Sequence, residues 1–283
     1  MMSEQTVDPT TWFEGRPRVM FVHAHPDDET ITTGGTLAAL AEAGLEPLLV
    51  TLTRGEQGEV TPGPLQALAG SHGLAVVRQN ELRTALGMLG VERHAFLGAE
   101  PARAEGLPPY IYEDSGMAWG SDGRVTAAPE ASRDALTSAP AVEVLNDLLA
   151  AAYQAGAQAI VSYDDGGGYG HPDHRLAHRL SRAVAHALEL PFWEIVPDPE
   201  PLAAPGADDA GSPGPPAAGD AGPAGTGTET DATVERHDIS PWLERKVAAL
   251  RAHGTQLTVD GGDIVHVGGQ REPIGGVESF RRV

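Results

Sequence analysis

Cysteine is absent from all 283 residues of the chain. This absence excludes disulfide frameworks, thiolate zinc sites and thiol nucleophiles. Any metal ion must therefore be bound by histidine, aspartate or glutamate side chains. The sequence has 11 histidines and 40 acidic residues, so such ligands are in ample supply.

Long apolar runs are also missing. No stretch approaches the roughly 18 apolar residues that would span a bilayer. The first residues, MMSEQTVDPTTWFEG, lack the basic and apolar regions of a secretory signal peptide. We therefore expect a cytoplasmic protein with no membrane partner.

Positive charge is scarce relative to negative charge. Nineteen Lys and Arg residues face 40 Asp and Glu residues, which gives a formal net charge of -21. Such a charge repels polyanions, so nucleic acid is not an expected partner. A small neutral or cationic substrate fits better, although solubility alone also accounts for a surplus of surface charge. The sequence leaves the oligomeric state open.

The apolar pattern predicts an α/β fold, a Rossmann-like and mostly parallel sheet with helices on both faces. A single domain over residues 1–283 is expected. Buried strands are predicted at 18–24, 47–53, 94–97 and 159–163, and helices at 35–44, 73–90, 141–155 and 241–253. In such sheets ligands bind at the carboxyl ends of the strands, which is where the chemically interesting turns fall.

Two segments interrupt this alternation. Residues 100–130 are aromatic and glycine-rich and resemble a loop that covers a site, with residues 110–120 as its candidate moving part. Residues 197–233 contain no Lys or Arg and almost no large apolar side chain. Because burial cannot offset the ordering entropy of such a segment, we expect a disordered acidic insertion there.

The first dense group of polar residues is AHPDDE at residues 24–29. The turn after the strand can aim His25 and Asp28 at one point, as a pair of metal ligands, and leaves Asp27 free as a base. Taken alone, the acidic run has a simpler interpretation, in which the carboxylates cap a helix that starts near residues 33–36. His23 is then a core histidine.

A second HPD turn changes the balance between these interpretations. The sequence HPDH at residues 171–174 again follows a predicted strand and places His174 at the start of a helix. His25, Asp28 and His174 together form the two-histidine, one-carboxylate set of an open catalytic zinc site. The pair of turns favours a metal site over two helix caps. His178, four residues further on, is expected to pack rather than to bind metal.

With these two motifs the sequence resembles the PIG-L/LmbE-like zinc-dependent N-deacetylases, whose hallmarks are an AHPDDE turn and a later HPDH. The resemblance implies one zinc ion, or iron(II) in the cell, on His25, Asp28 and His174, with Asp27 as general base. It also implies that His171, steadied by Asp173, acts as the opposing acid. The remaining catalytic residue that it implies is Tyr169, which would polarise the amide oxygen.

The same resemblance implies four contacts to the amino-sugar substrate. Glu59, Arg78 and Asp114 would bind hydroxyl groups and Met117 would line the pocket, although each also has an ordinary structural interpretation. Family members have a pair of asparagines before the last Pro-Ile dipeptide, and Gly268 and Gly269 replace this pair here.

Within the family the similarity is greatest to the branch that deacetylates N-acetylglucosaminyl-inositol in mycothiol biosynthesis. The segments that carry it are VTLTRGEQGEV, YEDSGMAWG, KVAALRAHGTQLTV and PIGGVESFRRV. A mycothiol S-conjugate amidase and another amino-sugar N-deacetylase are alternative functions. A metal-dependent sugar-binding protein without turnover is an alternative from another class, although binding alone would require neither Asp27 nor His171.

Overall fold

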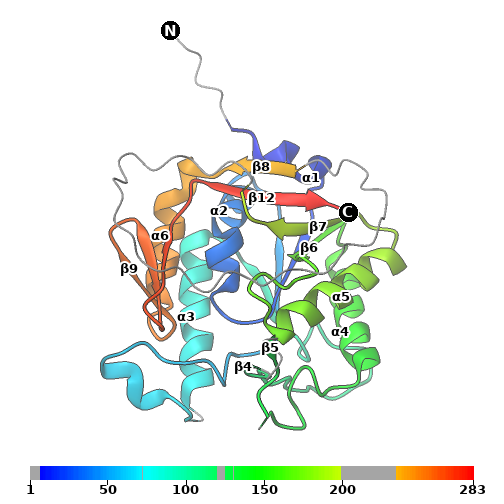
Figure 1. The fold of residues 1–283 in the computed structure, drawn as a ribbon. Helices are drawn as coiled ribbons and strands as arrows, with labels where there is room; N and C mark the ends of the chain where they lie inside the picture. The colour runs from blue at the N-terminus through cyan, green and yellow to red at the C-terminus, as the bar shows by residue number, and fades with distance from the viewer. Residues whose placement is uncertain (1–6, 72, 120–124, 130, 199–233) are drawn as a thin grey trace, which may run out of the picture.

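The computed structural model describes residues 7–71, 73–119, 125–129, 131–198 and 234–283. Within these residues a central seven-stranded sheet has the order β3-β2-β1-β6-β7-β12-β8 (Figure 1). The first five strands in this order are parallel to one another. β12 pairs antiparallel with β7, and the edge strand β8 pairs antiparallel with β12. The strands are β1 (Val19–His23), β2 (Leu48–Thr51), β3 (Arg93–Phe96), β6 (Ala159–Tyr163), β7 (Phe192–Val196), β8 (Val234–Asp238) and β12 (Val277–Arg282). The predicted mostly parallel α/β fold is confirmed.

Helices cover both faces of this sheet (Figure 1). One layer contains α2 (Asp28–Glu42), α3 (Gly73–Leu89) and α6 (Leu243–Ala252), and the other contains α4 (Ala141–Ala155) and α5 (Pro172–Ala187). Successive residues of β1 alternate between the layers, because side chains on a strand point to opposite faces. Phe21 packs in the α2 layer, whereas Met20 and Val22 pack in the α4 layer.

Shorter elements surround the central sheet. A three-stranded sheet is formed by β9 (Leu257–Asp260), β10 (Asp263–His266) and β11 (Arg271–Pro273), and a two-stranded one by β4 (Ala118–Trp119) and β5 (Val125–Thr126). The remaining short helices are η1 (Pro9–Thr11), α1 (Trp12–Gly15), η2 (Pro64–Leu68) and η3 (Ser240–Trp242). In the described part of the chain no helix is long and apolar enough to cross a membrane.

The sequence located most of the elements but misplaced one start. Helix α2 begins at Asp28 rather than at residue 35, because the buried carboxylate of Glu278 accepts the N–H groups of Gly35 and Thr36 and stabilises this glycine- and threonine-rich segment as helix. Strands β7 and β8 were not predicted. The predicted insertion at 197–233 lies, from residue 199 onward, outside the described residues, as does part of the 110–120 loop.

Gly35 marks a close approach between α2 and the segment after β8. A Cβ atom at this position would lie 2.5 Å from Cβ of Ile239, whereas one at Gly34 would lie 3.4 Å from Cγ of Lys246, an ordinary van der Waals contact. We expect Gly35→Ala to lower the free energy of unfolding by about 1–3 kcal/mol through overpacking. Gly34→Ala, the matched control, should raise it by up to about 1 kcal/mol. Urea unfolding midpoints of the two variants would check this, and equal midpoints would contradict it.

Candidate metal centre and active site

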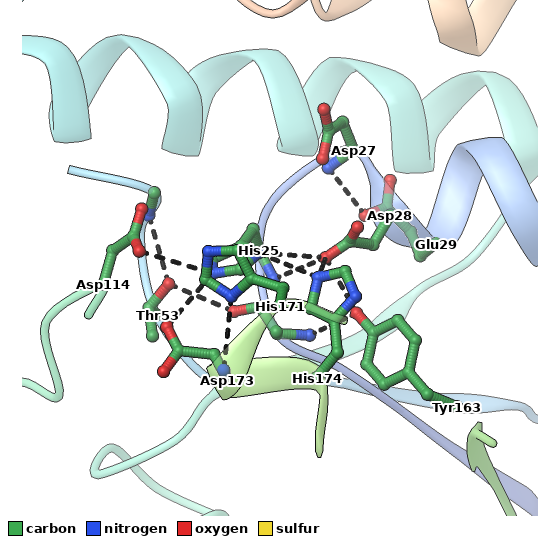
Figure 2. Close-up of polar contacts among 12 residues, drawn as sticks. His25, Asp27, Asp28, Glu29, Thr53, Asp114, Tyr163, His171, Asp173 and His174 are labelled. Carbon is green, nitrogen blue, oxygen red and sulfur yellow. Dashed lines mark hydrogen bonds and ion pairs between the residues drawn. The ribbon is translucent and has the colours of Figure 1, made fainter. Parts of the chain in front are cut away.

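Three side chains meet at the carboxyl edge of the sheet (Figure 2). His25 lies in the turn after β1, and Asp28 is the first residue of α2. His174 lies in the first turn of α5, which follows β6. The neighbouring parallel strands β1 and β6 bring together residues that are about 150 positions apart in sequence.

The spacing of their polar atoms is uniform. Nδ1 of His25 lies 3.3 Å from Oδ2 of Asp28, Nε2 of His174 lies 3.3 Å from the same oxygen, and the two nitrogens are 3.3 Å apart. Ligands at zinc bond lengths of 2.0–2.1 Å on a tetrahedron would be separated by about 3.4 Å. The three atoms therefore could hold a metal ion on one face and leave the fourth position open.

A second group of nitrogens offers another arrangement. His25, His171 and His174 each have a ligand atom within 4.8 Å of the others. We favour Asp28 as the third ligand because its oxygen is equally close to both histidines. Burial would raise the pKa of Asp28, but His174 and His25 hold it well below its ordinary value. A carboxylate that is ionised at neutral pH suits a metal ligand.

Tyr163, at the end of β6, was not predicted from the sequence. Its hydroxyl donates a hydrogen bond of 2.8 Å to Oδ2 of Asp28, and its ring stacks on His174 with centroids 4.1 Å apart. The backbone N–H of His25 donates to the same oxygen at 2.9 Å. Burial and the charge of Asp28 raise the pKa of Tyr163 well above its ordinary value, so the hydroxyl remains a donor. Tyr163 thus orients two of the three candidate ligands.

The other ring nitrogen of His25 faces two carboxylates. Its Nε2 lies 3.2 Å from Asp173 and 3.5 Å from Asp114. The same oxygen of Asp173 accepts the backbone N–H of Ser115 at 3.0 Å. A carboxylate on the distal nitrogen of a ligand histidine fixes its tautomer and ring orientation. Asp173 and Asp114 therefore support His25 directly.

His171 and Asp173 interact differently from the arrangement implied by the family resemblance. Nδ1 of His171 accepts the backbone N–H of Asp173 at 3.2 Å, while the carboxylate of Asp173 faces His25. In the neutral ring the proton is then on Nε2. Burial and the nearby charges of His25 and His174 lower the pKa of His171 to about 3. Tyr169 is 65% exposed and contacts the ring of His171 edge-on, with centroids 6.0 Å apart.

Asp27 lies beside the candidate ligands in a strained backbone conformation, with φ 115° and ψ -34°. Although it occupies the N-cap position of α2, its side chain makes no capping hydrogen bond. Among the described residues, none donates a hydrogen bond to its carboxylate. Its burial and the charge of Asp28 raise the pKa of Asp27 to about 7. The helix-cap interpretation of this residue therefore has no support.

A cavity of about 700 Å³ is lined by His25, Asp27, Asp28, Tyr169 and His171. Glu59, Arg78, Asp114 and Met117, the four predicted substrate contacts, all lie in its wall. The guanidinium of Arg78 also binds the carbonyls of Gly55 and Glu59, so it stabilises the loop after β2. The β10–β11 hairpin also lines this cavity, through His266, Gly268, Gln270 and Glu272.

The two histidines expected to be structural lie in packed environments. His23 is fully buried and its Nε2 bonds to the hydroxyl of Thr33 at 3.1 Å. Burial lowers the pKa of His23 to about 4, so the ring is neutral. Nδ1 of His178 bonds to the carbonyl of Tyr163 at 2.9 Å. Neither residue lines the cavity.

Fold and site together define an α/β protein with a candidate metal centre at the carboxyl edge of its sheet. Residues 20–185 match the family model described as "PIG-L: GlcNAc-PI de-N-acetylase", and the chain belongs to this family. The family predicted from the two HPD turns, and the N-deacetylase class of hydrolases, are thereby confirmed.

The names of similar proteins point to one reaction. The chain is 38% identical to a "1D-myo-inositol 2-acetamido-2-deoxy-alpha-D-glucopyranoside deacetylase" of Kineococcus radiotolerans, over 86% of this chain and 70% of the relative. It is also 38% identical to a protein of the same name from Thermobifida fusca, over 93% of this chain and 91% of the relative.

Solved structures support the fold at lower sequence identity. A deacetylase of the teicoplanin biosynthesis pathway superposes with a TM-score of 0.58 at 17% identity, over 94% of this chain and 97% of that one. The N,N'-diacetylchitobiose deacetylase from Pyrococcus horikoshii gives a TM-score of 0.52 at 20% identity, over 87% of this chain and 73% of that one. These two likenesses concern the fold alone.

Proposed function

We propose that this chain hydrolyses the acetamide of 1D-myo-inositol 2-acetamido-2-deoxy-alpha-D-glucopyranoside to acetate and the free amine, a step of mycothiol biosynthesis. The observation that carries this proposal is the set of three equidistant ligand atoms beside the carboxylate of Asp27. The names of relatives that cover most of the chain support the choice of substrate. Packing of the described residues around one central sheet supports a single domain.

His25, Asp28 and His174 are proposed to hold one zinc ion, with iron(II) as the alternative in the cell. Their mutual distances and their two-nitrogen, one-oxygen composition fit a catalytic site with an open position. When bound at such a site, a divalent ion lowers the pKa of a water toward about 7 and polarises a carbonyl oxygen.

Asp27 is proposed to take the proton of the water that attacks the acetyl carbon. The C–N bond then breaks, and the amine needs a proton to leave. If His171 were protonated to an imidazolium, its Nδ1 would also carry a proton. That N–H would point at the backbone N–H of Asp173, which donates to Nδ1 in the structure. We therefore propose that Asp27 returns the proton to the amine, while Nε2–H of His171 and the hydroxyl of Tyr169 hydrogen-bond the substrate oxygen. The family-implied role of His171 as the acid stays a prediction.

The cavity has the size of small-molecule sites, which span roughly 300–1,000 Å³, and could enclose two sugar-sized rings. Glu59, Arg78 and Asp114 are proposed to bind the hydroxyls of these rings, with Met117 packing against them. The acidic lining suits a neutral polyol, and no nucleic acid or membrane partner is proposed. The reaction is proposed to take place in the cytoplasm.

The test is amine release from the inositol glycoside by zinc-reconstituted protein, with metal-stripped protein as control and a mycothiol S-conjugate in parallel. We expect metal-dependent release from the glycoside at a kcat/KM well above that for the conjugate. Greater activity on the conjugate would reassign the chain to the amidase alternative. Metal binding without release from either would overturn the proposed substrate.

A further inference from the structure

Two fully buried ionisable side chains beside the active site have no place in the mechanism above. Glu29 lies in the first turn of α2, and His253 follows the last residue of α6. Both are 0% exposed, and Nε2 of His253 lies 3.3 Å from Oε1 of Glu29. Because removing ionisable groups from water is costly, a buried pair at this place needs a reason beyond stability.

The pair is joined directly to Asp27. The backbone N–H of Asp27 donates to Oε2 of Glu29 at 3.0 Å (Figure 2). In the described part of the chain this is the one hydrogen bond made by that N–H. A non-glycine residue at a φ of 115° costs on the order of 1–3 kcal/mol and persists where its surroundings enforce it. Glu29 is the side chain that holds the backbone of Asp27 through this bond.

Glu29 is in turn fixed by its neighbours. Its Oε1 accepts the hydroxyl of Thr30 and faces His253. Nε2 of His253 also contacts that hydroxyl at 3.1 Å. Thr255, two residues after His253, bonds to the carboxylate of Glu81 on α3 through both its N–H at 2.7 Å and its hydroxyl at 2.6 Å. The segment that carries His253 is thus anchored to a second helix.

We propose that Glu29 and His253 are positioning residues that hold Asp27 in its strained conformation, so that its carboxylate faces the cavity. The inference rests on the proposed role of Asp27 as the base. His253 connects the far end of α6 to the turn that carries the chemistry. Its loss should misplace Asp27 without removing a metal ligand or a substrate contact.

The test compares His253→Leu with the conservative variant His253→Gln. Because a misplacement of about 1 Å can cost about 10²-fold in rate, we expect His253→Leu to lower kcat by about 10- to 100-fold. KM and zinc stoichiometry should stay unchanged. The side-chain amide introduced by His253→Gln can still reach Glu29, and most of kcat should return.

His237 provides a matched control. It is also 0% exposed and bonds to a glutamate, Glu235, at 2.9 Å and to a threonine, Thr36, at 3.1 Å, but it lies on β8 away from the cavity. We expect His237→Leu to lower the midpoint of unfolding and to leave kcat unchanged below that midpoint. An unchanged kcat in His253→Leu, or an equal fall in His237→Leu, would overturn the proposal.

A crystal structure of His253→Leu separates this inference from the proposed function. The positioning role predicts that φ of residue 27 leaves the region near 115° in the variant, whether or not the enzyme acts on the inositol glycoside. If the wild type released no amine but φ shifted in the variant, the proposed function alone would fail. If the wild type were active and φ stayed unchanged, the positioning role alone would fail.

Discussion

The His174→Ala variant is expected to lose stoichiometric zinc together with its activity. The imidazole supplies one of three ligand atoms that lie 3.3 Å from one another. Loss of a residue that merely supports a ligand typically costs about 10–100-fold in metal affinity, so loss of a direct ligand should cost more than about 10²-fold. Zinc content after dialysis, and affinity by competition with a chelating dye, would measure this independently of turnover.

His178→Ala is the matched control for His174→Ala. Both histidines are buried on α5, four residues apart, but His178 bonds to the carbonyl of Tyr163 rather than to the candidate ligands. We expect His178→Ala to bind one zinc ion while unfolding at a lower temperature. A His174→Ala protein that kept one zinc ion at wild-type affinity would show that the metal lies elsewhere, with the group of His25, His171 and neighbouring carboxylates as the first place to look.

The sequence was sufficient to predict that His25, Asp28 and His174 come together, because their convergence follows from the topology of the sheet. Two HPD turns follow two buried apolar strands, and parallel neighbouring strands end at the same edge of the sheet. The structure pairs β1 directly with β6, and this pairing alone brings His25 and His174 together. The same reasoning placed α4 and β6 at the residues where they occur.

Contacts that depend on side-chain rotamers could not be predicted in this way. Tyr163 looks like an ordinary buried strand residue, yet its hydroxyl reaches Asp28. The carboxylate of Asp173 faces His25 rather than His171, because the start of α5 presents its backbone N–H to His171. His253 is 224 residues from Glu29, and no local pattern joins them.

The start of α2 illustrates a limit of local propensity. Two adjacent glycines and several threonines argue against a helix over residues 30–36. In the structure the buried carboxylate of Glu278 accepts the N–H groups of Gly35 at 2.9 Å and Thr36 at 2.8 Å, and Ile239 occupies the space that a larger side chain would need. Tertiary contacts from the last strand thus stabilise a helix that the local sequence disfavours.

Asp27→Asn is expected to lower kcat by about 10²- to 10⁴-fold, the usual contribution of a general base, and to retain one zinc ion. The amide is nearly the same size as the carboxylate but cannot accept a proton from water. Because none of the described residues donates a hydrogen bond to the Asp27 carboxylate, the substitution should break no contact of the folded protein. Single-turnover rates, zinc content and unfolding midpoints would separate chemistry from metal binding and from stability.

Comparison of Asp27→Asn with His171→Gln tests which residue carries the proton to the amine. The side-chain amide introduced by His171→Gln can still donate a hydrogen bond from about the position of Nε2 but cannot be protonated near neutral pH. If Asp27 both takes and returns the proton, His171→Gln should lose far less than Asp27→Asn. Losses of equal size would mean that His171 itself becomes an imidazolium. The backbone N–H of Asp173 donates to Nδ1 of His171, so it would then have to turn away during the reaction. Near-wild-type turnover of Asp27→Asn at saturating zinc would instead remove Asp27 from the chemistry altogether.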